Sequence, residues 1–155
     1  MGRKGTVGAV HYAESDFWPI DTVYFVRPLK GDDLGFLHYL LQYLPLGQLN
    51  AATGVPGLSR RDAYALNGVF PASLSDQERI AETLGKIDRE ITNVCGDSIN
   101  QRMLKVSIFV DDNGSELNSS IPSYAKALID LKRTLMDEIF TGKLAVASLA
   151  PGQPL

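Results

Sequence analysis

The chain has 155 residues, 45% of them hydrophobic, which suits one domain with a modest core, or a small domain with a helical extension, rather than two full domains. Its formal net charge of −3 argues mildly against DNA binding, since DNA-binding proteins usually carry a basic face that neutralises phosphates. Cys95 is the single cysteine, which excludes an internal disulfide, and no leader or long apolar run is present, so we expect a cytoplasmic protein.

The N-terminal part is expected to form two β-strands. Gly2, Gly5 and Gly8 punctuate a basic turn that runs into a short strand, and this turn alone is more typical of a hairpin than of a phosphate-binding loop. Residues 17–28 are rich in β-branched and aromatic side chains and have a proline near each end, which predicts a second strand. Neither side of this strand is fully polar, so we expect it to be mostly buried, with Trp18 in the core.

A helix is expected next. Asp32 or Asp33 can cap it, and it extends to about Leu44, where Pro45 stops it. His38 lies within this helix without the spacing of a metal ligand, so we assign it to packing or to the surface.

Residues 47–62 form a loop by composition and are followed by a short predicted strand at 66–71. Within the loop, Ser59 can cap a short helix that begins with Arg60 and Arg61. A helix start with two guanidinium groups is suited to bind an anion, but a solvated turn with surface arginines explains the same residues.

Two later segments carry narrow apolar seams. Ser75 and Glu78 match a capping box, which predicts a helix over 75–94, and a second helix is expected over about 123–140, ending at Gly142. Such seams suit a partner helix, although ordinary amphipathic helices show the same spacing. The helix-pairing residues are Ile80, Leu84, Ile87, Ile91 and Val94 in the first helix and Tyr124, Leu128, Leu131, Leu135 and Ile139 in the second.

Four stretches resemble the specificity (S) subunit of bacterial type I restriction-modification systems. Residues 2–8, GRKGTVG, resemble the glycine-rich segment of that family's target recognition domain, and residues 52–59, ATGVPGLS, resemble its later loop. Residues 70–81 resemble the proline and Gln-Glu-x-Ile-Ala start of the conserved spacer helix, and residues 131–144 resemble the end of a spacer helix. The order and approximate spacing of these motifs agree with the family.

The resemblance implies an α+β fold, in which a small, partial, β-rich target recognition domain is followed by two long antiparallel helices of coiled-coil type. The expected domains are residues 1–74 for DNA recognition, residues 75–144 for the helices with an insertion at about 96–122, and residues 145–155 as a disordered tail. The chain departs from the family because the upstream half of the recognition domain is missing before Met1 and because of this insertion.

In that family the S subunit has no catalytic role, and the resemblance implies the same here, with no cofactor and no metal. It also implies double-stranded DNA as a partner, together with the methyltransferase (M) subunit, which docks on the helices, and through it the motor and nuclease (R) subunit. The expected DNA-binding residues are Arg3, Lys4, Thr6, Asn50, Thr53, Ser59, Arg60 and Arg61. The alternative is a truncated remnant that acts as a helix-mediated interaction or oligomerisation module, for example a homodimer, without sequence-specific DNA binding.

Overall fold

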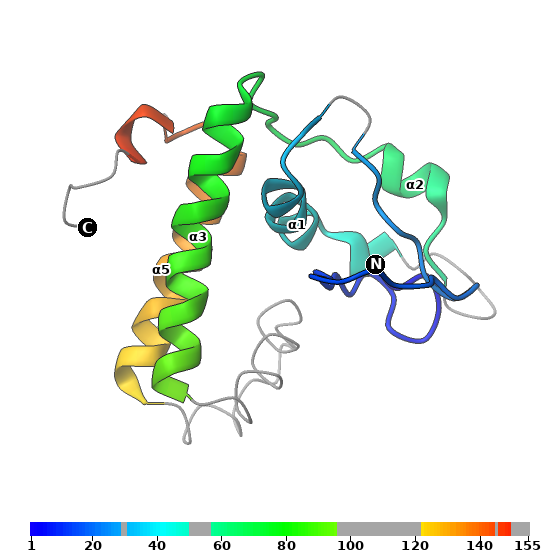
Figure 1. Cartoon of the computed structure of the whole chain (residues 1–155), viewed down its shortest axis with the longest axis horizontal. Coiled ribbons are helices and arrows are strands. Elements are labelled where there is room, and N and C mark those ends of the chain that lie inside the picture. Colours follow the sequence, from blue (N-terminus) through cyan, green and yellow to red (C-terminus); the bar gives the residue numbers. More distant parts are fainter. Residues whose placement is uncertain (29–30, 50–56, 96–121, 145, 150–155) are drawn as a thin grey trace. The chain divides into compact units, whose positions relative to one another are not determined.

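The computed structural model describes residues 1–28, 31–49, 57–95, 122–144 and 146–149 (Figure 1). The chain divides into two compact units, Met1–Glu78 (unit 1) and Arg79–Leu155 (unit 2). In chain order the elements are α1 (Leu34–Tyr43), the 3-10 helix η1 (Leu46–Leu49), α2 (Arg60–Tyr64), α3 (Leu74–Cys95), α5 (Ser123–Phe140) and the 3-10 helix η2 (Val146–Leu149).

The predicted α+β fold class is wrong. The described residues contain four α-helices and no sheet, so the expected β-rich domain does not form and the helices are not limited to two long ones. The strands expected within residues 2–12, 17–28 and 66–71 do not form, and the β-pairing among the described residues is one isolated antiparallel bridge between Gly2 and Val23. A β-prone composition gives a strand only where a neighbouring strand completes the ladder, and a single bridge does not provide one.

The aromatic segment at residues 17–26 is exposed. Trp18 is 91% exposed, so its expected place in the core is wrong, and Phe17, Ile20 and Phe25 also lie largely in solvent. Their composition indicates burial, but burial needs a facing layer of structure. The described residues of unit 1 place no such layer over these side chains.

One buried cluster of unit 1 is built from turns and η1. It consists of Val7, Val10, Leu46 and Leu58, while Phe36, Tyr39 and Leu40 are buried in α1. The glycine-rich turn closes on itself through hydrogen bonds from the Gly2 amide to the Ala9 carbonyl at 2.8 Å and from the Gly8 amide to the Gly2 carbonyl at 3.0 Å. This part of the core therefore depends on the geometry of the turn.

Gly8 shows why the turn requires glycine. Its φ of +79° lies in the left-handed region, and a Cβ at this position would lie 2.4 Å from the Gly47 nitrogen. Any side chain would push η1 away from the turn. Gly5 also has a positive φ, of +80°, but a Cβ there would have no atom within 4 Å.

Helix α1 forms where it was expected. Asp33 is its N-cap and its carboxylate accepts a hydrogen bond of 2.7 Å from the Phe36 amide, which confirms one of the two predicted caps. The helix ends at Tyr43, just before Pro45. Phe36 is fully buried and packs edge-to-face against Phe70 at 5.2 Å between ring centroids.

The predicted capping box at the start of α3 is wrong. The helix begins at Leu74, and the Gln77 amide donates to the Ser73 carbonyl at 3.2 Å, so Ser75 lies inside the first turn. Gln77 is buried instead, and its side-chain oxygen accepts from the Asp33 amide at 2.8 Å while its nitrogen donates to the Pro71 carbonyl at 3.0 Å. Gln77 thereby ties the first turn of α3 to the start of α1.

In unit 2, α3 and α5 lie side by side and run in opposite directions (Figure 1). The Lys132 ammonium contacts the Asp88 carboxylate at 2.6 Å, and both side chains are largely buried. The other buried side chains of the two helices are mainly aliphatic: Ile80, Leu84, Ile87, Ile91 and Cys95 in α3, and Ala125, Leu135, Met136, Ile139 and Phe140 in α5.

The end of α5 matches the expected glycine C-cap. Gly142 has a φ of +74°, and the Lys143 amide donates to the Glu138 carbonyl at 2.9 Å. Val146–Leu149 forms η2, so these residues of the predicted disordered tail are helical, whereas residues 145 and 150–155 and most of the predicted insertion lie outside the described residues. No described helix is long and apolar enough to cross a membrane.

Candidate nucleic-acid interface

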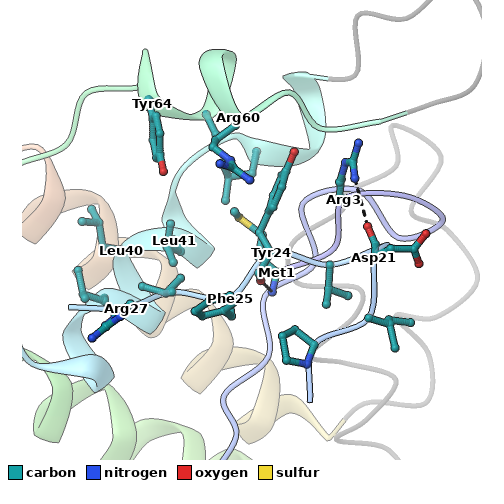
Figure 2. A pocket seen from close by; sticks show the side chains of 17 residues that line it. Met1, Arg3, Asp21, Tyr24, Phe25, Arg27, Leu40, Leu41, Arg60 and Tyr64 are labelled. Carbon is teal, nitrogen blue, oxygen red and sulfur yellow. Dashed lines mark hydrogen bonds between the residues drawn. The ribbon is translucent and has the colours of Figure 1, made fainter. Parts of the chain in front are cut away.

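Arg3 and Arg60, which are far apart in the sequence, meet at one tyrosine in unit 1. The guanidinium carbon of Arg3 lies 5.7 Å from the centroid of the Tyr24 ring, and that of Arg60 lies 5.3 Å from it. Both distances are within the range of a cation–π interaction. We call Arg3 and Arg60 the arginine pair, and Figure 2 shows them on either side of Tyr24.

Hydrogen bonds to the backbone fix the segments that carry the arginine pair. The Leu58 amide donates to the Arg3 carbonyl at 2.9 Å, and the Tyr24 hydroxyl donates to the Leu58 carbonyl at 3.1 Å. The Arg3 amide donates in turn to the Thr22 carbonyl at 2.9 Å. The glycine-rich turn, residues 22–24 and the segment before α2 therefore form one hydrogen-bonded junction.

The N-terminal ammonium of Met1 belongs to the same junction. It donates to the Tyr24 carbonyl at 2.9 Å, and burial lowers its pKa because the charged form loses hydration. Arg3 is also held from its side chain, since one guanidinium nitrogen donates to the Asp21 carbonyl at 3.2 Å. The position of Arg3 is therefore determined by several contacts.

The arginine pair carries uncompensated charge. Among the described residues, neither Arg3 nor Arg60 forms an ion pair with a carboxylate. Guanidinium groups without a carboxylate partner remain available for an external anion. Their planar donors match the geometry of a phosphate.

The other predicted DNA-binding residues that the structure describes are solvent-exposed. Lys4 and Thr6 lie in the glycine-rich turn beside Arg3, and Ser59 and Arg61 flank Arg60. Ser59 is the N-cap residue of α2, as expected, but its side chain makes no capping hydrogen bond. The remaining two predicted residues, Asn50 and Thr53, lie outside the described residues.

Sequence reasoning missed the part played by Tyr24. Its place in an aromatic segment predicts a strand residue, whereas in the structure it links the arginine pair and bonds the Leu58 carbonyl. Nothing in the local sequence pairs residues 3, 24 and 60. Arg27 was also missed, and it lines a pocket of unit 1 together with the arginine pair.

The predicted helix-pairing residues lie in α3 and α5, with most of them buried. Ile80, Leu84, Ile87 and Ile91 are buried in α3, as are Leu135 and Ile139 in α5; Val94, Leu128 and Leu131 are half-buried. Tyr124 is 56% exposed, whereas Ala125 and Lys132 are buried. The buried face of α5 therefore lies one residue later than the seam predicts at these positions.

The described residues contain no group of three or more His, Cys, Asp or Glu side chains that could hold a metal ion. His38 packs edge-to-face against Tyr12 and Tyr39, and its ring lies 2.9 Å from the Gln42 amide nitrogen. Cys95 is buried at the end of α3.

Comparisons with known proteins give no match: no protein-family model, curated protein or solved structure matches this chain. The resemblance to specificity subunits therefore remains a prediction. The arginine pair is a feature of the described structure that suits an anionic partner.

Proposed function

We propose that the chain is a non-catalytic, DNA-binding subunit or half-subunit of the kind found as the specificity subunit of type I restriction-modification systems. In this proposal the arginine pair is the centre of the contact with DNA. The observation that carries this proposal is the meeting of Arg3 and Arg60 at Tyr24, with both guanidinium groups free of carboxylates. Lys4 and Arg61, their exposed neighbours in the chain, add two further positive charges. Contacts of this kind to phosphates provide affinity that depends little on sequence.

The net charge of −3 is compatible with such a role because the charge is unevenly distributed. Residues 1–74 carry equal numbers of basic and acidic groups, so the acidic excess lies in the rest of the chain. A local basic site can therefore act on DNA from unit 1, since the field near the surface is set by the nearest charges once salt screens the others.

The helices provide the second half of the proposal. We assign the docking of methyltransferase subunits, and through them of the motor and nuclease subunit, to the α3 and α5 pair. The ion pair between Lys132 and Asp88 supports a defined arrangement of the two helices, because a buried charge pair disfavours other registers. A defined helix pair is a suitable platform for a partner subunit.

A gel-shift series on mixed duplex DNA tests the proposal. We expect Arg60→Ala and Arg61→Ala to weaken binding of all sequences alike if they contact phosphates, and to relax preference at one position if they contact a base. Arg133→Ala is the matched control, since Arg133 is an exposed arginine of α5. Unchanged affinity in both test variants would remove these two arginines from the interface.

The second candidate is a protein-interaction module that does not read DNA. The exposed apolar side chains at residues 17–26 favour it, since a patch of this kind often marks a protein contact. The two candidates differ in their response to salt, because phosphate contacts give a steep loss of DNA affinity as salt increases. Measuring the mass of the protein in solution, alone and mixed with a methyltransferase subunit, tests the docking that both candidate functions allow.

A further inference from the structure

A large hollow opens in unit 1 beside the arginine pair. Its volume is about 850 Å³, which falls in the range of pockets that bind small organic ligands. Three arginines and one aspartate line it, namely Arg3, Arg27, Arg60 and Asp21, so its lining carries a net positive charge. The hollow lies entirely among residues 1–64.

The remaining lining is apolar and aromatic. Leu40 and Leu41 of α1 form part of it, together with Phe25 and Tyr64. Figure 2 shows Tyr64 and Arg60 extending from α2 toward the leucines and Tyr24. Tyr64 is 81% exposed and Phe25 is 60% exposed, so much of both side chains is open to solvent.

This combination selects the chemistry of the ligand. The guanidinium groups need an anion, and phosphate suits their planar donors. The exposed rings and the leucines need a flat, largely apolar body, and a nucleobase stacks readily on aromatic side chains. An inorganic anion alone would leave the apolar part of the hollow in contact with water.

We infer that the hollow binds one nucleoside phosphate unit, with its phosphate near the arginine pair and its base against Tyr64, Phe25 and the leucines of α1. The unit is either a nucleotide extruded from DNA or a free nucleotide, since the two share this chemistry. If the ligand is a nucleotide extruded from DNA, the inference rests on the proposed function and extends it. The protein then prefers DNA with one unstacked base over a fully paired duplex.

The test uses the full chain and fluorescence polarisation with two labelled duplexes that differ in one unpaired base. We expect the duplex with the unpaired base to bind about tenfold more tightly, because the cost of extruding that base is already met. Tyr64→Ala and Phe25→Ala should each reduce this preference while changing the affinity for the paired duplex less than about twofold. Tyr124→Ala is the control, since Tyr124 is an exposed tyrosine of α5 outside the hollow.

A second arm titrates free deoxynucleoside monophosphates and inorganic phosphate by calorimetry. Nucleotide binding that exceeds phosphate binding and is lost in Tyr64→Ala supports the inference, even if no DNA is bound and the proposed function fails. Paired and unpaired duplexes of equal affinity, with nucleotide binding no tighter than phosphate, overturn the inference and leave the proposed function standing. If neither DNA nor nucleotides bind, both are overturned.

Discussion

In unit 2 the described buried side chains come mostly from α3 and α5 at helical spacing. In unit 1 some come from α1, but one buried cluster comes from turns, η1 and the segment before α2. The helices bury side chains every three or four residues, and each helix is stabilised by its own backbone hydrogen bonds. The turns of unit 1 are held by hydrogen bonds between distant segments, such as that from Leu58 to Arg3. The turn-built cluster of unit 1 is therefore more sensitive to backbone geometry, and the helix pair of unit 2 to the loss of side-chain volume.

The largest expected effect concerns the core of unit 2. Leu84→Ala should lower the free energy of unfolding by about 2–5 kcal/mol, because Leu84 is completely buried and its truncation leaves a cavity. Leu74→Ala, at an exposed position of the same helix, should change it by less than about 0.5 kcal/mol. Urea denaturation followed by circular dichroism measures both, and equal effects would show that α3 has no buried face.

The next effect concerns the backbone of unit 1. Gly8→Ala should destabilise the protein by about 2–4 kcal/mol, since it adds strain at a positive φ to a clash with the Gly47 backbone. Gly5→Ala carries only the strain at positive φ and should cost about 1 kcal/mol. The same denaturation measurement compares them. A Gly5 variant as unstable as the Gly8 variant would contradict the close approach of the turn to η1.

The ion pair in unit 2 gives a smaller effect. Lys132→Ala should destabilise the protein by about 1–3 kcal/mol, because it removes the ammonium group that lies 2.6 Å from the largely buried Asp88 carboxylate. The double variant Lys132→Met with Asp88→Leu should recover most of that loss, since both charges of the pair are then removed. Denaturation of the single and double variants forms the test. A double variant less stable than Lys132→Ala would show that the ion pair stabilises the fold in addition to fixing the register of the two helices.

The smallest effect concerns an exposed ion pair within α3. The Lys86 ammonium, 2.8 Å from the Glu82 carboxylate, lowers the pKa of that carboxyl by a hydrogen bond and by its charge. Lys86→Gln should return this pKa toward its usual range. A lowered pKa in the folded state means that any stabilisation is present above the unfolded pKa and is lost as the pH falls through the folded pKa. An NMR titration of Glu82 checks the shift, and a pKa unchanged by the substitution would contradict it.

The same contrast explains which features could be predicted from sequence. The extents of α1 and α5, the Asp33 cap and the Gly142 C-cap depend on residues within a few positions of one another, and the sequence shows them. The strands were wrong because β-pairing depends on a partner strand that the local sequence does not reveal.

The candidate site was predictable only in part. Arg3 and Arg60 stand out as basic residues beside glycine-rich segments, but their meeting at Tyr24 depends on contacts between segments distant in the sequence. The burial of Gln77 was equally hidden, since a glutamine in a polar helix start gives no sign that three hydrogen-bond partners surround it.

The salt dependence of duplex DNA binding tests the central proposal most directly. If Arg3, Lys4, Arg60 and Arg61 all contact phosphates, the logarithm of the binding constant should fall with the logarithm of salt concentration with a slope of about −3.6. Arg60→Ala should reduce the magnitude of that slope by about 1, and Arg133→Ala should leave it unchanged. No binding at low salt, or a slope that Arg60→Ala does not alter, would contradict the assignment of the arginine pair to DNA.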